Sequence, residues 1–192
     1  MLPMRESPAI ETRASRIAGC LILKPAIWSD ERGYFFESWS DRWRAVLGHG
    51  IELVQDNQSR SCRHVLRGLH YQIGSAAQGK LVWVTSGKVF DVVVDLRQSS
   101  PTFGRWIGHY LDADRCERIW IPEGCAHGFL VITDYADFQY KVTQPYSPEH
   151  ERSLNWRDES LSISWPLPAD ALPIVSSKDA IAPFFGECEK FS

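Results

Sequence analysis

The sequence has no long hydrophobic run, and no stretch approaches the roughly 20 consecutive apolar residues of a membrane-spanning helix. It also has no block rich in lysine and arginine, and its 21 basic and 24 acidic residues give a net charge of −3. The first 16 residues, MLPMRESPAIETRASR, carry charges where a signal peptide would have an apolar core. We therefore expect no membrane partner and no nucleic-acid partner.

The cysteines are irregularly spaced. The chain has an odd number of cysteines without any Cys-x-x-Cys motif, namely Cys20, Cys62, Cys116, Cys125 and Cys188. This pattern argues against a disulfide framework and against a structural zinc site. We interpret the five side chains as reduced thiols of a cytoplasmic protein.

Internal repeats and low-complexity tracts are also absent, and a length of 192 residues suits one domain. Residues 1–16 are polar and unpatterned, and we expect them to be an N-terminal tail or arm. Residues 17–192 are expected to form a single domain, which includes an irregular, proline-rich segment from about residue 147. One helix is predicted over residues 40–48, with Ser40 as its N-cap and Gly48 at its end.

What the chain does contain is a series of short runs rich in β-branched and aromatic residues, separated by Gly, Pro and Asp. Alternation of apolar and polar residues in these runs predicts strands. In KVFDVVVDLR (88–97), Phe90, Val92 and Val94 share a face with Leu96, so we expect a strand with only that face buried. The sequence predicts an all-β sandwich or barrel of about ten strands. Expected strands lie within residues 17–25, 33–39, 64–72, 81–87, 88–97, 105–111, 117–122, 128–134 and 137–143.

Histidine is placed too sparsely for a metal-dependent, cupin-like barrel. Such a site uses His-x-His with a nearby Glu on one hairpin and a third His later in the chain. Here LHYQIG supplies His70 followed by Gln72, and IPEGCAHGF supplies His127. Two histidines are too few for three ligands, so we expect no catalytic metal, and a metal-dependent oxygenase is disfavoured.

The stretch VLRGLHYQ (65–72) combines an arginine, a glycine and a histidine on one predicted strand. His70 is either a core histidine or a catalytic base, since an imidazole titrates near neutral pH. On a regular strand Arg67 and His70 would face opposite sides, but a bulge at Gly68 would turn both into one cavity. Tyr140 shares an inward face with Phe138 and is either a core aromatic or a reactive hydroxyl.

Several motifs together resemble one family closely. In chain order they are DERGYFFES, LVQDNQSRS, VLRGLHYQ, QGKLVWV, GKVFDVVVDLRQSSPTFGRW, WIPEGCAHGF and YKVTQPYSPEHE, followed by WP and SSKDA. Their joint order and spacing resemble those of the dTDP-4-dehydrorhamnose 3,5-epimerases, cupin-like enzymes of dTDP-L-rhamnose synthesis. The resemblance runs from about Ile17 to about Phe184. It implies a jelly-roll fold with a few short helices and a homodimer whose partner contributes to each site.

The resemblance also implies roles for single residues. His70 matches the base of the family, Asp179 in SSKDA matches the carboxylate that orients the base, and Tyr140 matches the acid. Tyr146 matches an aromatic residue that stacks on the thymine ring. Positions that match substrate-binding residues are Arg32, Glu37, Gln55, Asp56, Asn57, Arg67, Lys80, His127, Glu151 and Lys178.

The implied substrate is dTDP-4-dehydro-6-deoxy-D-glucose, whose C3 and C5 hydrogens flank the C4 ketone. The ketone acidifies both hydrogens, so no cofactor is expected. Pro145 stands where the family pattern often has a second tyrosine. This departure keeps open a single-centre (3- or 5-) epimerase, or an isomerase acting on another nucleotide-linked 4-keto sugar. A non-catalytic sugar-binding β-barrel is a further alternative, and it would not require His70, Asp179 and Tyr140 to converge.

Overall fold

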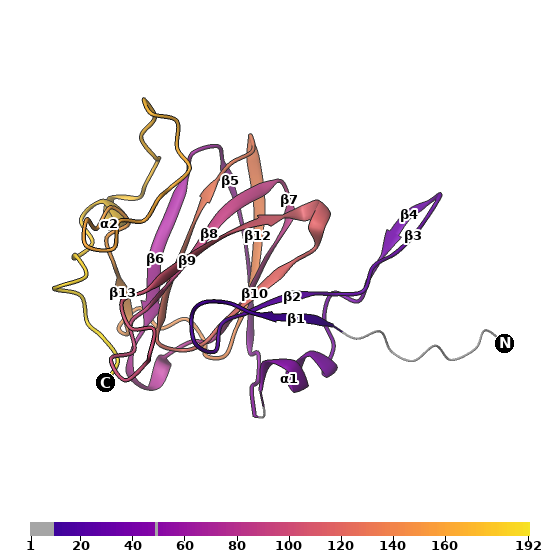
Figure 1. Ribbon diagram of the computed structural model, residues 1–192, viewed down its shortest axis with the longest axis horizontal. Helices are drawn as coiled ribbons and strands as arrows, with labels where there is room; N and C mark the ends of the chain where they lie inside the picture. The colour runs from indigo at the N-terminus through magenta and orange to yellow at the C-terminus, as the bar shows by residue number, and fades with distance from the viewer. Residues whose placement is uncertain (1–9, 49) are drawn as a thin grey trace.

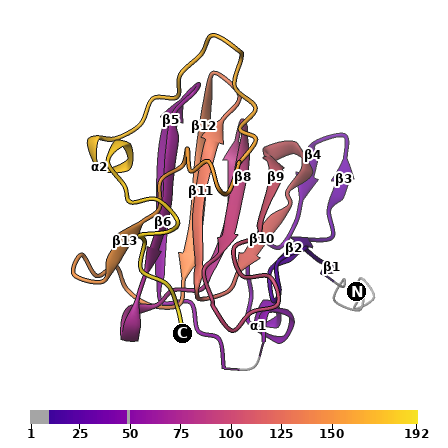
Figure 2. The same cartoon turned by 60° about the vertical axis from the view of Figure 1, so that its left-hand side comes forward.

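Two antiparallel β-sheets face each other and form the body of the molecule (Figure 1, Figure 2). The computed structural model describes residues 10–48 and 50–192. In the six-stranded sheet the order is β1 (Glu11–Ala14), β2 (Leu21–Lys24), β10 (Arg118–Ile121), β7 (Lys80–Ser86), β12 (Tyr135–Val142) and β5 (Gln55–Cys62). In the five-stranded sheet the order is β13 (Glu151–Ser153), β6 (Leu66–Gln72), β11 (Cys125–Val131), β8 (Lys88–Asp95) and β9 (Trp106–Asp112). Many neighbouring strands are distant in sequence, as in a jelly roll, and the predicted all-β jelly-roll fold is confirmed.

The main core lies between the two sheets. It is built from β-branched and aromatic side chains that point inward, such as Val82, Ile119 and Phe138 from the six-stranded sheet and Val93 and Phe129 from the five-stranded sheet. Each of these side chains is buried. The alternation of strand side chains places them on one face of each strand, which is why these strands were predictable from the sequence.

A second core covers the outer face of the five-stranded sheet. Val92 and Val94 of β8 pack there against Leu154 and Phe191 of the C-terminal segment. Both valines are fully buried. The irregular segment that follows β13 therefore completes the domain by covering a sheet face that would otherwise be exposed.

The inner face of β8 is buried as well, so the prediction that this strand buries only one face was wrong. Asp91 and Asp95 are almost completely shielded from solvent. Both carboxylates have polar partners, because Asp91 is hydrogen-bonded to His127 and Asp95 accepts hydrogen bonds from Arg97 and Ser100. Local alternation missed this burial because the covering residues come from distant parts of the chain.

Helices are few and short. The structure contains α1 (Arg42–Leu47), α2 (Ser177–Ala180) and one-turn 3-10 segments at Gly74–Ala76 and Ala113–Arg115. The N-cap of α1 is Asp41 rather than the expected Ser40, whose hydroxyl instead donates to Glu37. The helix ends at Gly48 as predicted, and its φ of 131° favours glycine. Over residues 10–48 and 50–192, no helix has the length and apolar character needed to span a bilayer.

The N-terminal region adds an edge to the six-stranded sheet. Residues 1–9 of the expected tail or arm lie outside the described residues. Within the remainder, β1 pairs with β2, and all four of its residues are exposed. The described part of the expected arm thus includes an edge strand, and a domain boundary after residue 16 stays a prediction.

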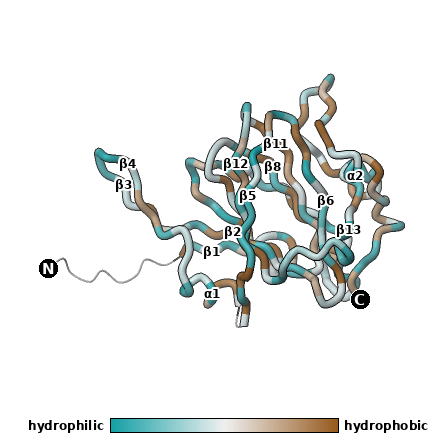
Figure 3. Tube along the Cα trace, turned by 180° about the vertical axis from the view of Figure 1, so that it is seen from behind, coloured by the Kyte–Doolittle hydropathy of each residue, from teal (hydrophilic) through white to brown (hydrophobic). Residues whose placement is uncertain are grey.

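A small hairpin projects away from the two sheets (Figure 1). It consists of β3 (Trp28–Asp30) and β4 (Gly33–Phe35), which pair only with each other among the described strands. Its tip is hydrophilic (Figure 3), but Tyr34 and Phe35 on β4 are 63% and 71% exposed. Exposed aromatic side chains on a projecting hairpin are typical of a contact surface.

Candidate active site

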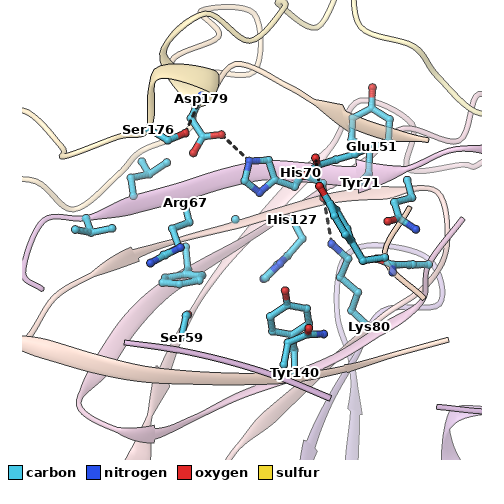
Figure 4. Close-up of a pocket in the computed structure, with 18 of the residues that line it drawn as sticks. Ser59, Arg67, His70, Tyr71, Lys80, His127, Tyr140, Glu151, Ser176 and Asp179 are labelled. Atoms are coloured by element: carbon cyan, nitrogen blue, oxygen red, sulfur yellow. Dashed lines mark hydrogen bonds and ion pairs between the residues drawn. The ribbon is translucent and has the colours of Figure 1, made fainter. Parts of the chain in front are cut away.

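A cavity of about 760 Å³ opens between the two sheets. Its walls come from β5, β6, β7, β11 and β12, from β13 and the loop before it, and from the segment that leads into α2 (Figure 4). The lining includes ten side chains predicted from the sequence: Gln55, Asn57, Arg67, His70, Lys80, His127, Tyr140, Tyr146, Glu151 and Asp179. The fold therefore brings residues from most of the chain to one site.

A bulge in β6 explains how Arg67 and His70 both reach the cavity. His70 pairs with His127 and Arg67 pairs with Phe129, so three steps along β6 match two along β11. Gly68 lies between them with a φ of +116°, a conformation that glycine adopts without strain. The bulge proposed from the sequence is confirmed.

We expect Gly68→Ala to destabilise the protein by about 2 kcal/mol or more and to reduce activity. An added Cβ would lie 2.7 Å from both the Cα of Gly128 and the carbonyl oxygen of His127, and backbone atoms of a paired strand cannot move aside easily. Gly33→Ala is the matched control, because Gly33 has a similar φ of +125° but no heavy atom within 4 Å of the added carbon. Urea unfolding gives the free energy of unfolding of both variants, and the difference between them measures the cost of the close contacts at Gly68. Equal losses of stability in the two variants would contradict this account.

His70 and Asp179 form a close pair although they are 109 residues apart. Nε2 of His70 lies 2.5 Å from Oδ1 of Asp179, whose side chain is only 3% exposed (Figure 4). Burial raises the pKa of Asp179. The hydrogen bond and charge of His70 oppose this effect, and so do hydrogen bonds from Ser176 and Gly68. The net result is a pKa below the ordinary value of an aspartate. The ionised carboxylate can only accept, so Nε2 of His70 donates to it. Nδ1 is the other ring nitrogen and is not engaged by Asp179.

Asp179 is held in place by its own helix and by the bulge. Its backbone N–H donates to Oγ of Ser176 at 3.1 Å, the N-cap interaction of α2. The amide of Gly68 donates to Oδ2 at 3.4 Å. The bulge residue therefore also helps to orient the carboxylate behind the imidazole.

Tyr140 lies on the opposite wall of the cavity from His70 (Figure 4). It belongs to β12 of the six-stranded sheet, whereas His70 belongs to β6 of the five-stranded sheet. Burial raises the pKa of the Tyr140 hydroxyl, the charge of Arg67 opposes the shift and the charge of Glu151 adds to it. A protonated phenol thus faces an imidazole across a space between two sheets.

Comparison with known proteins identifies the family. A family profile described as dTDP-4-dehydrorhamnose 3,5-epimerase matches residues 14–187. The chain is 50% identical over 182 residues to a dTDP-4-dehydrorhamnose 3,5-epimerase of Pseudomonas aeruginosa, a match that covers 93% of this chain and 99% of that one. The chain belongs to the dTDP-4-dehydrorhamnose 3,5-epimerase family.

Solved structures agree with this assignment to the epimerase family. A dTDP-6-deoxy-D-glucose-3,5-epimerase from Legionella pneumophila, in complex with dTDP-4-keto-L-rhamnose, superimposes with a TM-score of 0.88 at 46% identity and covers 93% of this chain and 94% of its own. A 3'-monoepimerase from Streptomyces bikiniensis, in complex with dTDP-quinovose, gives a TM-score of 0.83 at 36% identity, with 90% and 86% coverage. The fold of the family therefore includes enzymes that differ in how many centres they invert.

Lys80 places a cation beside His70 in the cavity. Its Nζ donates to the carbonyl oxygen of His70 at 3.3 Å, and its side chain is buried. Burial lowers the pKa of Lys80 from 10.5 to about 8, and the charges of Glu151 and Asp91 oppose this shift. The ammonium is therefore mostly protonated at pH 7 and is poorly solvated, so it can interact strongly with an oxyanion.

We expect Lys80→Met to stabilise the protein at pH 7 while lowering turnover by roughly 10²-fold. The lowered pKa means that the charged Lys80 reduces the free energy of unfolding by roughly 3 kcal/mol at pH values below about 8. Between pH 8 and pH 10.5 the unfolded chain holds the lysine proton while the folded chain loses it, so this penalty falls as pH rises. Urea unfolding should show a gain at pH 7 that shrinks toward zero by about pH 10.5, and a variant less stable than wild type at both pH values would contradict this.

Two further residues that line the cavity, His127 and Arg67, are each hydrogen-bonded to a polar side chain behind the cavity wall. Nε2 of His127 lies 2.8 Å from Oδ2 of Asp91, and both side chains are buried. Nε of Arg67 donates to Oγ of Ser61 at 2.9 Å, which leaves the rest of its guanidinium for other acceptors. These contacts hold an imidazole and a cation at the cavity wall in defined orientations.

Four residues that match the epimerase pattern do not line the cavity. Asp56 points to the other side of β5 and pairs with Lys141. Lys178 pairs with Glu151, 2.5 Å away, so it lies next to the site without lining the cavity. Arg32 pairs with Asp30 on the projecting hairpin, and Glu37, just beyond β4, pairs with Arg42.

The cavity also contains residues that sequence reasoning missed. Ser59, Gln72, Gln78 and Ser176 line it, and Asp91 supports His127. The strand β5 itself was not predicted, because its half-buried side chains are polar rather than apolar. The sequence QDNQSRSC has no apolar alternation, so the burial pattern of this strand is visible only in the structure.

No metal centre is evident in the described part of the chain. Nowhere in residues 10–48 and 50–192 do three or more His, Cys, Asp or Glu side chains gather as a metal site would require. The expectation that the epimerase works without metal stays a prediction.

Proposed function

We propose that this protein inverts C3 and C5 of dTDP-4-dehydro-6-deoxy-D-glucose and so forms dTDP-4-dehydro-L-rhamnose. The observation that carries the proposal is the arrangement of a carboxylate-backed imidazole and a protonated phenol on opposite walls of one cavity. Inversion next to a ketone needs a base on one face of the carbon and an acid on the other. His70 and Tyr140 supply these two groups.

In each inversion, Nδ1 of His70 takes the hydrogen from the carbon next to C4. The electron pair of the broken C–H bond forms the C=C bond of an enolate, and the negative charge moves to O4. Lys80 is positioned to stabilise this oxyanion, because its ammonium group is hydrogen-bonded to the carbonyl oxygen of His70 and so lies next to the base. The hydroxyl of Tyr140 then delivers a proton to the opposite face, and solvent restores both groups. Asp179 stabilises the imidazolium that forms in between.

The remaining lining residues suit a nucleoside diphosphate. Arg67 offers a guanidinium that can bind diphosphate oxygens in a bidentate way. Tyr146 is 55% exposed and presents its ring at the cavity, where a base can stack on it. The amide side chains of Gln55 and Asn57 add donors and acceptors.

A single-centre epimerase is the second candidate, because the chain resembles a 3'-monoepimerase in structure and carries Pro145 beside Tyr146. Incubation with dTDP-4-keto-6-deoxyglucose in deuterium oxide separates the two. Deuterium at both C3 and C5 of the inverted product supports double inversion, and deuterium at only one carbon supports the single-centre enzyme. A protein that binds the nucleotide sugar without any exchange would be the non-catalytic barrel.

We also propose that the active form is a homodimer in which the hairpin of one copy reaches the cavity of the other. The support is that Arg32 and Glu37 match substrate-binding positions of the family but lie far from their own cavity, on or next to a hairpin with exposed aromatic side chains. The exposed edge strand β1 offers a further surface for pairing.

Complementation between variants tests the dimer. Arg32→Ala and His70→Ala are each expected to be inactive, whereas their co-expressed mixture should recover turnover. In a mixed dimer, the intact cavity of one copy receives the intact hairpin of the other. A monomer in sedimentation at micromolar concentration, or a mixture without activity, would contradict the proposal.

We place the protein in the cytoplasm as one domain that follows a short N-terminal arm. The support for the compartment is that all five cysteines are free thiols, which suits reducing surroundings. We expect no cofactor because the ketone of the substrate already activates the hydrogens that are removed.

A further inference from the structure

Gln72 links the base to the aromatic ring at the cavity. It lies two residues after His70 on β6, so the two side chains share a face of the strand. Its side chain is almost completely buried, at 3% exposure, which is unusual for a glutamine. A buried amide of this kind persists only where its hydrogen bonds are made, so its partners show what it holds.

All the partners of the Gln72 amide are backbone groups of two loops. Nε2 donates to the carbonyl oxygen of Ala76 at 2.7 Å and to that of Pro145 at 3.2 Å. Oε1 accepts from the backbone N–H of Ser147 at 2.8 Å. One side chain therefore binds the residue before Tyr146 and the residue after it.

Tyr146 itself is hydrogen-bonded to residues of both sheets. Its backbone N–H donates to Oε1 of Gln55 on β5 at 2.9 Å, and its hydroxyl donates to Oε2 of Glu151 at 2.9 Å. Tyr146 belongs to none of the three core clusters, and the residue is 55% exposed. The position of the ring thus depends on polar contacts to its backbone and hydroxyl rather than on a core.

We infer that Gln72 is a positioning residue for nucleoside recognition, which sets the place of the Tyr146 ring relative to His70. This inference rests on the proposed function, because it assumes that a base stacks on Tyr146. Pro145 contributes to the same arrangement, since its ring restricts the backbone at the residue whose carbonyl Gln72 binds. Pro145, which replaces the first tyrosine of the Tyr-Tyr pair that is frequent in the family, therefore lies in the loop whose backbone Gln72 binds.

The test is a double-mutant cycle with Gln72→Leu and Tyr146→Ala, read by calorimetric titration with dTDP. Gln72→Leu should weaken dTDP binding by about tenfold or more, because the ring is no longer held in place. In the Tyr146→Ala background the same change should have almost no further effect. With dTDP-4-keto-6-deoxyglucose, KM should rise in Gln72→Leu while kcat stays within about twofold, since His70 remains in place.

Controls separate positioning from general damage. Asn155→Leu removes another buried side-chain amide, which is bonded to the carbonyl oxygen of Ala182 and the N–H of Arg157 and does not line the cavity, and should leave dTDP affinity unchanged. If Gln72→Leu does not fold, Gln72→Glu keeps the shape but loses both donors, and it should weaken binding in the same way. Unchanged dTDP affinity, or independent effects that multiply in the double variant, would overturn the inference while the proposed function stands. A wild-type protein that neither binds dTDP nor converts the sugar would overturn both.

Discussion

His70→Ala is expected to remove deuterium exchange at both C3 and C5 while dTDP still binds. One imidazole can serve both carbons, because they flank the same ketone and the sugar can adjust within the cavity. The loss of a general base is typically worth about 10²–10⁴-fold in rate, so exchange should fall far below the wild-type value. Product analysis by mass spectrometry and proton NMR measures each carbon separately.

His109→Ala is the matched control for this prediction. His109 also lies 3.1 Å from a carboxylate oxygen, that of Glu117, but it is on β9 and does not line the cavity. Its removal should leave exchange unchanged. Exchange at either carbon near the wild-type rate in His70→Ala would mean that another group acts as the base there.

Tyr140→Phe is expected to separate exchange from inversion. The change removes one hydroxyl and keeps the ring that packs near Phe138, so the fold should be preserved. His70 should still abstract the hydrogen and return deuterium on its own face, with the configuration retained. Inverted product should fall by about 10²–10⁴-fold, because the opposite face has lost its proton donor.

Tyr135→Phe serves as the control on the same strand. Tyr135 begins β12, is 48% exposed and does not line the cavity, so inversion should be unaffected by its change. Equal loss of exchange and inversion in Tyr140→Phe would indicate a role in binding or in stabilising the enolate. Unchanged inversion would show that Tyr140 is a core aromatic without a chemical role.

The strands with apolar alternation were predictable because burial of one face dictates their pattern. β5 was not predicted, since the side chains that alternate toward its half-buried face are the polar Gln55, Asn57 and Ser59. A strand that lines a polar cavity carries polar side chains on its inner face. These side chains can bind a ligand, but they remove the apolar alternation by which a strand is predicted from sequence. The face of β8 that contains Asp91 was misjudged in a related way, because its burial depends on pairing with His127.

The candidate site was only partly readable from local sequence. The bulge at Gly68 could be argued from three neighbouring residues, because Arg67 and His70 would face opposite sides of a regular strand and only a bulge would turn both into one cavity. Asp179 had no local signal, since a carboxylate 109 residues from its imidazole is found only through a family pattern or a fold. Gln72 was missed because a glutamine whose bonds go to loop backbones has no sequence signature. The family pattern likewise pointed to Arg32 without showing that it lies on a projecting hairpin.

The C-terminal segment has a consequence for the order in which the protein is made. A ribosome releases β6 and β8 long before the residues that cover them, including Phe191, which contacts Tyr71 and packs near Val94. Until these covering residues emerge, the five-stranded sheet has an uncovered apolar face, and such a nascent chain is prone to aggregate. His70 also has no carboxylate partner until Asp179 is synthesised, so a chain that stops before residue 179 would lack both the apolar cover and the carboxylate behind His70. Each newly made copy can therefore form the His70–Asp179 pair only after residue 179 has left the ribosome.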